Sequence, residues 1–226
     1  MPIASVGTIA KGFGSNGYTT GAIDTTGANL LVWTLADNNT GGTGPTLTDD
    51  YSNTWTLGQR WIPIGVATAI YYCENPIVGS GHTFTCAKTG GSNSGQVRAY
   101  SGAKASGTYD QDGTRSAFGA ATVTYNSITP TEDDELVVAF LNFDTAASLP
   151  TINSSFINPE GDIGSGGTYL GSVSADLIQT TAAALTPTWT HPSSNNLYAI
   201  IATFRADSVA PSPDPYVRPQ LAVYRT

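Results

Sequence analysis

The sequence predicts an all-β fold, a two-sheet antiparallel sandwich of jelly-roll-like type, and three observations support it. Apolar and polar residues alternate with a period of two along most of the chain, and no long segment keeps a helical period. Turn-forming clusters such as NNTGGTGPT, KTGGSNSG and THPSSNN separate these runs. Finally, 40% of the 226 residues are apolar, which is enough to form a core and argues against disorder.

Short strands are expected throughout the chain, in the number and spacing that are typical of a sandwich or jelly roll. The stretch 103–119 carries no clear alternation and is expected to be the longest connection. The expected strands cover residues 4–10, 18–25, 29–37, 53–61, 67–74, 82–88, 95–102, 120–128, 134–143, 149–157, 168–179, 184–190 and 196–206.

Two halves of the chain resemble one another. GANLLVWTLAD (27–37) is similar to DELVVAFLNFD (134–144), and PTLTDDYSNTW (45–55) is similar to PTINSSFINPE (150–160). We predict an internal duplication, with pseudo-repeats at about 18–103 and 120–206 inside one domain, 1–206; a chance resemblance between apolar strands is the alternative. Neither half is expected to cover its own apolar face, so the halves should pack as two facing sheets.

Charge excludes several classes of function. Only 12% of residues are charged, and the net charge of −8 argues against a nucleic-acid-binding protein, which needs a basic surface.

No run of 18 apolar residues occurs, so no membrane partner is expected. The first residues, MPIASVGTIAKGFGSNG, lack the basic and apolar regions of a secretory leader. Low charge favours a protein that works in contact with other proteins.

The two cysteines lie in YYCENPIVGSGHTFTC, which reads as a hairpin with its turn near Gly79 and Ser80. In that register Cys73 faces Cys86, and a disulfide between them is one reading. Two reduced, buried thiols are the other. No metal site is expected from the cysteines, because neither histidine joins them at ligand spacing.

No catalytic site is expected. The chain has no G-x-S-x-G motif, and His82 and His191 read as turn or strand-end residues. The four glutamates give no pair that would flank a cleft, and cofactor fingerprints are missing. Calcium is the most plausible ion, through Asp110 and Asp112 in YDQDGT with help from Asp49 and Asp50, but the signal is weak because the glutamate that ends an EF-hand loop is missing. A plain Asp-Gly turn is the simpler interpretation.

Aromatic residues suggest a glycan as a second type of partner. Trp33 and Trp189 lie in expected strands, where core packing is their ordinary use. Trp55 and Trp61, in the less regular WTLGQRW, are better placed to form a surface platform on which a sugar ring could stack.

Residues 207–226 are expected to form a Pro-rich C-terminal arm. Prolines favour an extended path without backbone donors, and the apolar end of the segment suits docking on a neighbouring subunit. An arm that lies on its own domain, or a disordered tail, is the alternative. The expected contact residues are Pro211, Pro213, Pro215, Tyr216, Pro219, Leu221, Val223 and Tyr224.

The order GANLLV, DDYSNTWT, AIYYCENPIVGSGHTFT, VRAYSGA and SITPTEDDELVVAF resembles a β-sandwich module that recurs in bacteriophage virion proteins and in secreted bacterial surface proteins. The resemblance spans about residues 4–206 and implies a jelly-roll-like sandwich in a virion or extracellular setting, with no catalytic motif to transfer. We therefore expect a non-enzymatic virion protein, a capsid decoration or a tail or fibre component, that assembles with itself or with other virion proteins. A secreted carbohydrate-binding or adhesive module is the alternative.

Overall fold

The computed structural model describes residues 2–38, 44–63, 65–144, 146–164 and 170–207. These residues form an all-β, antiparallel structure without a helix. The strands are β1 (Ala4–Gly14), β2 (Gly17–Thr19), β3 (Leu30–Asn38), β4 (Thr46–Asp49), β5 (Thr56–Trp61), β6 (Val66–Glu74), β7 (Phe84–Ala87), β8 (Asn93–Ser101), β9 (Tyr109–Thr124), β10 (Glu135–Phe143), β11 (Thr151–Ile152), β12 (Ile157–Asp162), β13 (Gly171–Gln179) and β14 (Thr188–Phe204).

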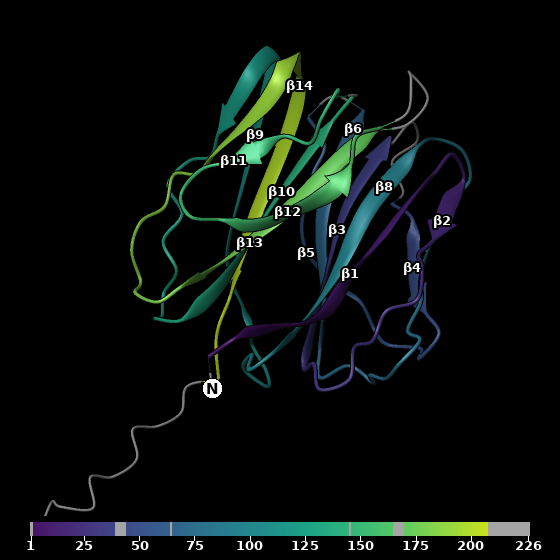
Figure 1. Cartoon of the computed structure of the whole chain (residues 1–226), viewed down its shortest axis with the longest axis vertical. Coiled ribbons are helices and arrows are strands. Elements are labelled where there is room, and N and C mark those ends of the chain that lie inside the picture. The colour runs from purple at the N-terminus through teal and green to yellow at the C-terminus, as the bar shows by residue number, and fades with distance from the viewer. Residues whose placement is uncertain (1, 39–43, 64, 145, 165–169, 208–226) are drawn as a thin grey trace, which may run out of the picture.

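Two large sheets face each other at the centre of the molecule. The first has the order β1-β8-β3-β6-β5, and the second has the order β12-β13-β10-β14, with β9 and β11 also paired to β14. A small sheet, β2-β7-β4, covers the outer side of the first sheet. Figure 1 shows β2 and β4 at one edge of the molecule and β9 and β11 at the opposite side, with the strands of the first sheet between them.

Residues 4–101, here called the first sandwich, have the wiring of a jelly roll. Except at β5, which joins β6 in the large sheet, the chain alternates between the two sheets, so that β1, β8, β3 and β6 lie in one layer and β2, β7 and β4 in the other. Residues 109–204, the second sandwich, repeat this strand order. There the long strands β9 and β14 bend at β-bulges, and the outer ends of both strands take the places of β2 and β7.

Three apolar clusters hold these layers together, because the central strands are buried on both faces. In β3, Leu30 and Val32 point toward the second sheet, while Leu31 and Trp33 point toward the small sheet. In β10, Val138 likewise faces the first sheet, and its neighbours face the outer layer of the second sandwich. Side chains that alternate across a strand explain why one apolar run can serve two cores.

The two sandwiches have the same strand order, as a duplication would produce, and a common origin of the two halves stays a prediction. Leu30 pairs with Tyr100, just as Leu136 pairs with Phe204. The expected packing of the halves as two facing sheets is confirmed, because the large sheet of each half buries one face against the other. Each sandwich has its own outer core, and only the face between the two large sheets is shared.

Several expected elements need correction. Residues 109–119 are not a connection, because they belong to β9, an edge strand with a largely solvent-facing surface and therefore little alternation. The expected strands 184–190 and 196–206 are joined in β14, since the THPSSNN segment is a bulged part of the strand rather than a turn. The expected hairpin of 67–74 with 82–88 is wrong, because β6 pairs with β3 and β5 whereas β7 pairs with β2 and β4.

Candidate functional site

The cysteines are free, buried thiols on different sheets. Cys73 lies on β6 and Cys86 on β7, and both contribute to the core between the first sheet and the small sheet. Burial raises the pKa of Cys73 to about 11 and that of Cys86 to about 12, so both stay protonated at neutral pH. Since the thiolate is the reactive form, these residues are suited to packing rather than to nucleophilic chemistry.

Asp110 and Asp112 lie in strand β9, not in a loop that could surround a calcium ion. Asp110 is paired with Arg205 and accepts hydrogen bonds from the backbone N–H and the hydroxyl of Thr131, both at 2.9 Å. Burial opposes ionisation of Asp110, but the bonds from Thr131, the neighbouring Glu135 and Arg205 together lower its pKa. Asp112 accepts a bond of 2.7 Å from Gln59 Nε2. The carboxylates therefore link β9 to its neighbours.

The two candidate platform tryptophans have different environments. Trp55 packs edge-on against Trp33 and Phe84, and its indole Nε1 donates to Asp49 Oδ2 at 2.9 Å. Trp61, at the end of β5, is 36% exposed. Because Trp55 is anchored in the core, Trp61 is the one of the two whose side chain is free to meet a partner.

The predicted arm, with its contact residues from Pro211 to Tyr224, lies outside the described residues. Exposed apolar side chains do occur among the described residues, on both faces of the chain along β5 at the edge of the first sheet. There Leu57 and Trp61 on β5 and the following Ile62 are exposed. We call these three residues the β5 edge surface. β5 pairs only with β6 in its sheet, so its other backbone edge has no strand partner there.

A cleft of about 420 Å³ lies where β1 passes over β8 and β12. β1 has a bulge between Val6 and Ala10, and the 2.9 Å ion pair between Lys11 and Glu160 forms part of the lining of the cleft. The lining is mainly polar and holds no aromatic ring: Ser5, Gly7, Thr8, Ile9, Lys11, Arg98 and Glu160.

A cluster of two aspartates and one histidine lies at the small sheet. Asp49 ends β4, Asp50 follows it, and His82 precedes β7, which is paired with β4. His82 Nε2 is 3.5 Å from Asp49 Oδ1 and 3.7 Å from Asp50 Oδ1. We call these residues the acid–histidine cluster. In the sequence, His82 reads as a turn or strand-end residue and Asp49 is grouped with Asp110, because the pairing of β4 with β7 is not visible in residue spacing.

Aromatic rings and one hydroxyl hold the His82 ring in place. The ring stacks on Phe84 with centroids 4.2 Å apart, and Tyr51 packs edge-on against it at 4.6 Å. His82 Nδ1 lies 3.0 Å from Thr25 Oγ1. Histidine, hydroxyl and carboxylate thus meet as in a hydrolase, but Thr25 and His82 are completely buried, so no substrate can reach the hydroxyl.

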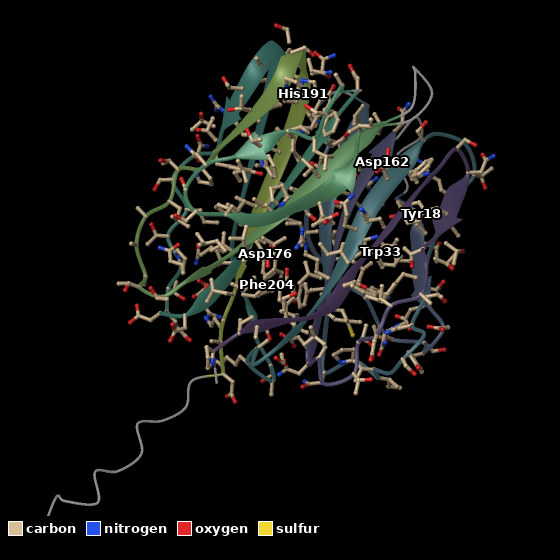
Figure 2. All side chains as sticks on the ribbon, in the orientation of Figure 1. Tyr18, Trp33, Asp162, Asp176, His191 and Phe204 are labelled. Atoms are coloured by element: carbon tan, nitrogen blue, oxygen red, sulfur yellow. The ribbon has the colours of Figure 1, made fainter. Side chains whose placement is uncertain are left out.

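His191, the other histidine, belongs to a separate environment in the second sandwich. Its Nδ1 is 2.7 Å from the Ser193 carbonyl oxygen, and its ring packs against Phe143. Figure 2 shows His191 at the end of the molecule far from Trp33 and Tyr18, which mark the core of the first sandwich. The two histidines therefore do not share a site.

Comparisons with known proteins give no relative: no family model, no curated protein and no solved structure matches the chain. Within the described residues, no helix is long and apolar enough to span a membrane.

Proposed function

We propose that this protein is a non-enzymatic structural component of a bacteriophage-like virion, either a capsid decoration or a tail or fibre component, that acts through contacts with neighbouring subunits. The observation that carries the proposal is the β5 edge surface. Leu57 is 47% exposed and Ile62 43%, in a chain with only 12% charged residues. Apolar side chains beside an open strand edge suit association with another protein, through burial and through added main-chain hydrogen bonds.

The architecture supports the same proposal by analogy alone. Jelly rolls are found in viral capsid proteins, and also in lectins and cupins, so the fold is compatible with assembly without specifying it. Two sandwiches with a shared core make a rigid block. Such a block presents its edges and loops in fixed positions, which a repeating lattice requires.

The test is an assembly experiment with a matched control. The oligomeric state of the purified chain, measured by sedimentation velocity over a range of concentrations, should depend on the β5 edge surface. Trp61→Lys should abolish self-association, whereas Ile77→Lys should not, because Ile77 is 61% exposed but belongs to the connection between β6 and β7 and not to the β5 edge surface. A wild-type chain that stays monomeric and is missing from purified virions by mass spectrometry would contradict the proposal.

A secreted carbohydrate-binding or adhesive module is the second candidate. The exposed ring of Trp61 and the polar cleft beside Lys11 and Glu160 favour it, because sugars are bound by aromatic faces and by convergent polar groups. Screening the wild-type chain on a glycan array is the direct measurement. Specific binding that Trp61→Ala or Glu160→Gln removes would support this candidate over the first.

A further inference from the structure

We propose that Asp49, Asp50 and His82 bind a divalent transition-metal ion, with zinc as the best match. The acid–histidine cluster brings one imidazole nitrogen and two carboxylate oxygens within 4.8 Å of one another. This inference goes beyond the proposed function, and it does not depend on whether the protein belongs to a virion.

The hydrogen bonds around His82 leave its Nε2 free to be a ligand. Thr25 Oγ1 donates its single proton to the Gly79 carbonyl oxygen at 3.2 Å and accepts the Gly79 N–H at 3.1 Å. With the hydroxyl proton assigned to Gly79, the 3.0 Å contact between Thr25 Oγ1 and His82 Nδ1 takes its proton from Nδ1. In a neutral imidazole, Nε2 then carries a lone pair, and that nitrogen is fully buried and has no hydrogen-bond partner.

In this arrangement the lone pair on Nε2 and the two carboxylates repel one another, and either a second proton on His82 or a metal ion between the three groups would remove that repulsion. A protonated histidine would approach a carboxylate to about 2.7–2.9 Å. The observed separations from Nε2, 3.5 Å to Asp49 and 3.7 Å to Asp50, are longer. They are close to the roughly 3.4 Å between two ligand atoms that bind one tetrahedral zinc ion at 2.0–2.2 Å. The spacing therefore favours a metal ion.

Asp49 is held in position by groups that a metal site would use as supports. Its Oδ2 accepts from Trp55 Nε1, and its Oδ1 accepts from the backbone N–H groups of Tyr51 at 3.0 Å and Asn53 at 3.1 Å. The Asn53 amide adds a longer bond of 3.3 Å to Oδ1. That bond can yield to a metal, because the same amide nitrogen also donates to the Ile77 carbonyl oxygen at 2.9 Å.

Asp50 provides the way in for an ion. Its side chain is 45% exposed, and its Oδ1 accepts the Thr83 N–H at 3.0 Å. An ion can therefore enter from solvent on the Asp50 side and keep a water molecule as a fourth ligand. One nitrogen and two oxygen ligands suit zinc, whereas calcium needs about six to eight oxygen ligands.

The second sandwich shows that the fold does not need these polar side chains at this place. His82 forms an isolated backbone bridge with Ile23, and Leu185 forms the same type of bridge with Ile128 in the second sandwich. The strand register pairs Thr48 with Thr85, and the Asn153 N–H donates to the Thr188 carbonyl oxygen in the corresponding position. On this register Ser154 and Ser155 replace Asp49 and Asp50, so the ligand set is confined to the first sandwich.

Calorimetric titration of the untagged, chelator-treated full chain with zinc chloride tests the proposal. We expect one zinc ion per chain and a higher unfolding temperature in its presence. Asp50→Asn keeps an oxygen for the Thr83 N–H but removes a charged ligand, and it should weaken zinc binding by about 100-fold or more, since even second-shell changes cost about 10–100-fold. His82→Leu, which copies the second sandwich, should abolish binding.

Two control variants separate this site from general effects of charge and histidine. Asp24→Asn alters an exposed carboxylate that also accepts a backbone N–H, at 2.9 Å from Thr26, and His191→Gln alters the other buried histidine. Both should bind zinc like the wild type. Binding that is absent in the wild type, or that Asp50→Asn leaves unchanged, would overturn the proposal. Asp50→Asn remains informative if His82→Leu does not fold.

Discussion

The two flanks of the core between the large sheets occupy equivalent places in the fold but have opposite chemistry. On one flank β8 faces β13, and on the other β14 faces β6. Arg98 pairs with Val32 across β8 and β3, exactly where Ala202 pairs with Val138 across β14 and β10. The first flank is polar, and the second is apolar. Figure 2 shows Asp176 and Phe204, one from each flank, in the interior of the molecule.

Direct hydrogen bonds connect the polar flank. Arg98 donates to Asp176 at 2.8 Å and to the Ser174 carbonyl oxygen at 2.9 Å, while Ser172 contacts Ser94 at 2.5 Å and Gln96 at 2.7 Å. Such directional bonds fit only one relative placement of the two sheets.

On the apolar flank, Ile70 and Tyr72 of β6 face Ile200 and Phe204 of β14, and Tyr72 meets Phe204 edge-on at 5.9 Å. Burial of these side chains is favourable without fixing a register. The comparison teaches that burial supplies the cohesion between the sandwiches, whereas the polar flank determines their alignment.

The largest expected effect comes from separating the buried ion pair. Arg98→Met should lower the free energy of unfolding by about 3–5 kcal/mol, because Asp176 would remain buried without its partner. Urea denaturation followed by tryptophan fluorescence measures this. The double variant Arg98→Met with Asp176→Leu makes this flank resemble the apolar one and should regain most of the loss. A double variant as unstable as Arg98→Met alone would show that the flanks are not interchangeable.

On the apolar flank, Ile200→Ala should lower the free energy of unfolding by about 2–5 kcal/mol, through lost burial and the cavity left behind. Unlike the loss caused by Arg98→Met, this loss of stability should not be regained by substituting a neighbouring residue. The control is Ile77→Ala at an exposed position, expected to change stability by less than about 0.5 kcal/mol. If Ile200→Ala lowered the free energy of unfolding as little as the control does, burial on this flank would contribute little to holding the two sheets together.

A smaller effect is expected where one hydroxyl connects two side chains of the polar flank. Ser172→Ala should cost about 1–3 kcal/mol, because it leaves the buried Ser94 hydroxyl and Gln96 amide without this partner. The same denaturation assay reports it, and Ser174→Ala, which removes a longer 3.2 Å bond from Arg98 Nε, should cost less. The reverse order would argue against the hydrogen-bond account.

The smallest expected effect concerns how the free energy of unfolding depends on pH, to which the polar flank should contribute and the apolar flank should not. Burial raises the pKa of Asp176, and Arg98 offsets this only in part. A folded-state pKa above the unfolded value of about 3.9 means that the folded chain binds the Asp176 proton more tightly. This contribution to stability is complete at low pH and is lost as the pH rises through the folded-state pKa.

Unfolding free energies measured at a series of pH values, from about pH 4 upward, test this. Asp176→Asn should remove that part of the pH dependence, and Ile200→Val on the apolar flank should leave it unchanged. Tyr100 also lies beside Asp176, and burial raises the pKa of its hydroxyl far above this range, so its titration does not contribute to the profile. A wild-type profile that Asp176→Asn does not alter would exclude Asp176 as the source.

Strand content and fold class could be predicted from the sequence where the alternation was strong. The runs around Leu31 and Val137 become β3 and β10, because their apolar side chains on both faces can be buried only in a strand that lies between two layers. Prediction failed for residues 109–119 in β9, because an edge strand exposes much of its surface and does not need apolar alternation.

The candidate sites depended more on tertiary structure. Cys73 and Cys86 are near in sequence but belong to different sheets, so a symmetric turn between them gave the wrong partner strands. Asp49 and His82 are far apart in sequence, and the pairing of β4 with β7 brings them together. Trp55 and Trp61 were equivalent in the sequence, yet only Trp55 reaches the core.

The sequence by itself determined that this chain is an all-β protein of low charge with two similar halves, because period-two alternation and turn residues are local properties of the chain. Tertiary structure alone decided which strands became neighbours, and through them which polar groups meet. The choice of pairing depends on burial across both faces of every sheet at once. For that reason Arg98 finds Asp176, and His82 meets Asp49 and Asp50, at contacts that no spacing in the sequence records.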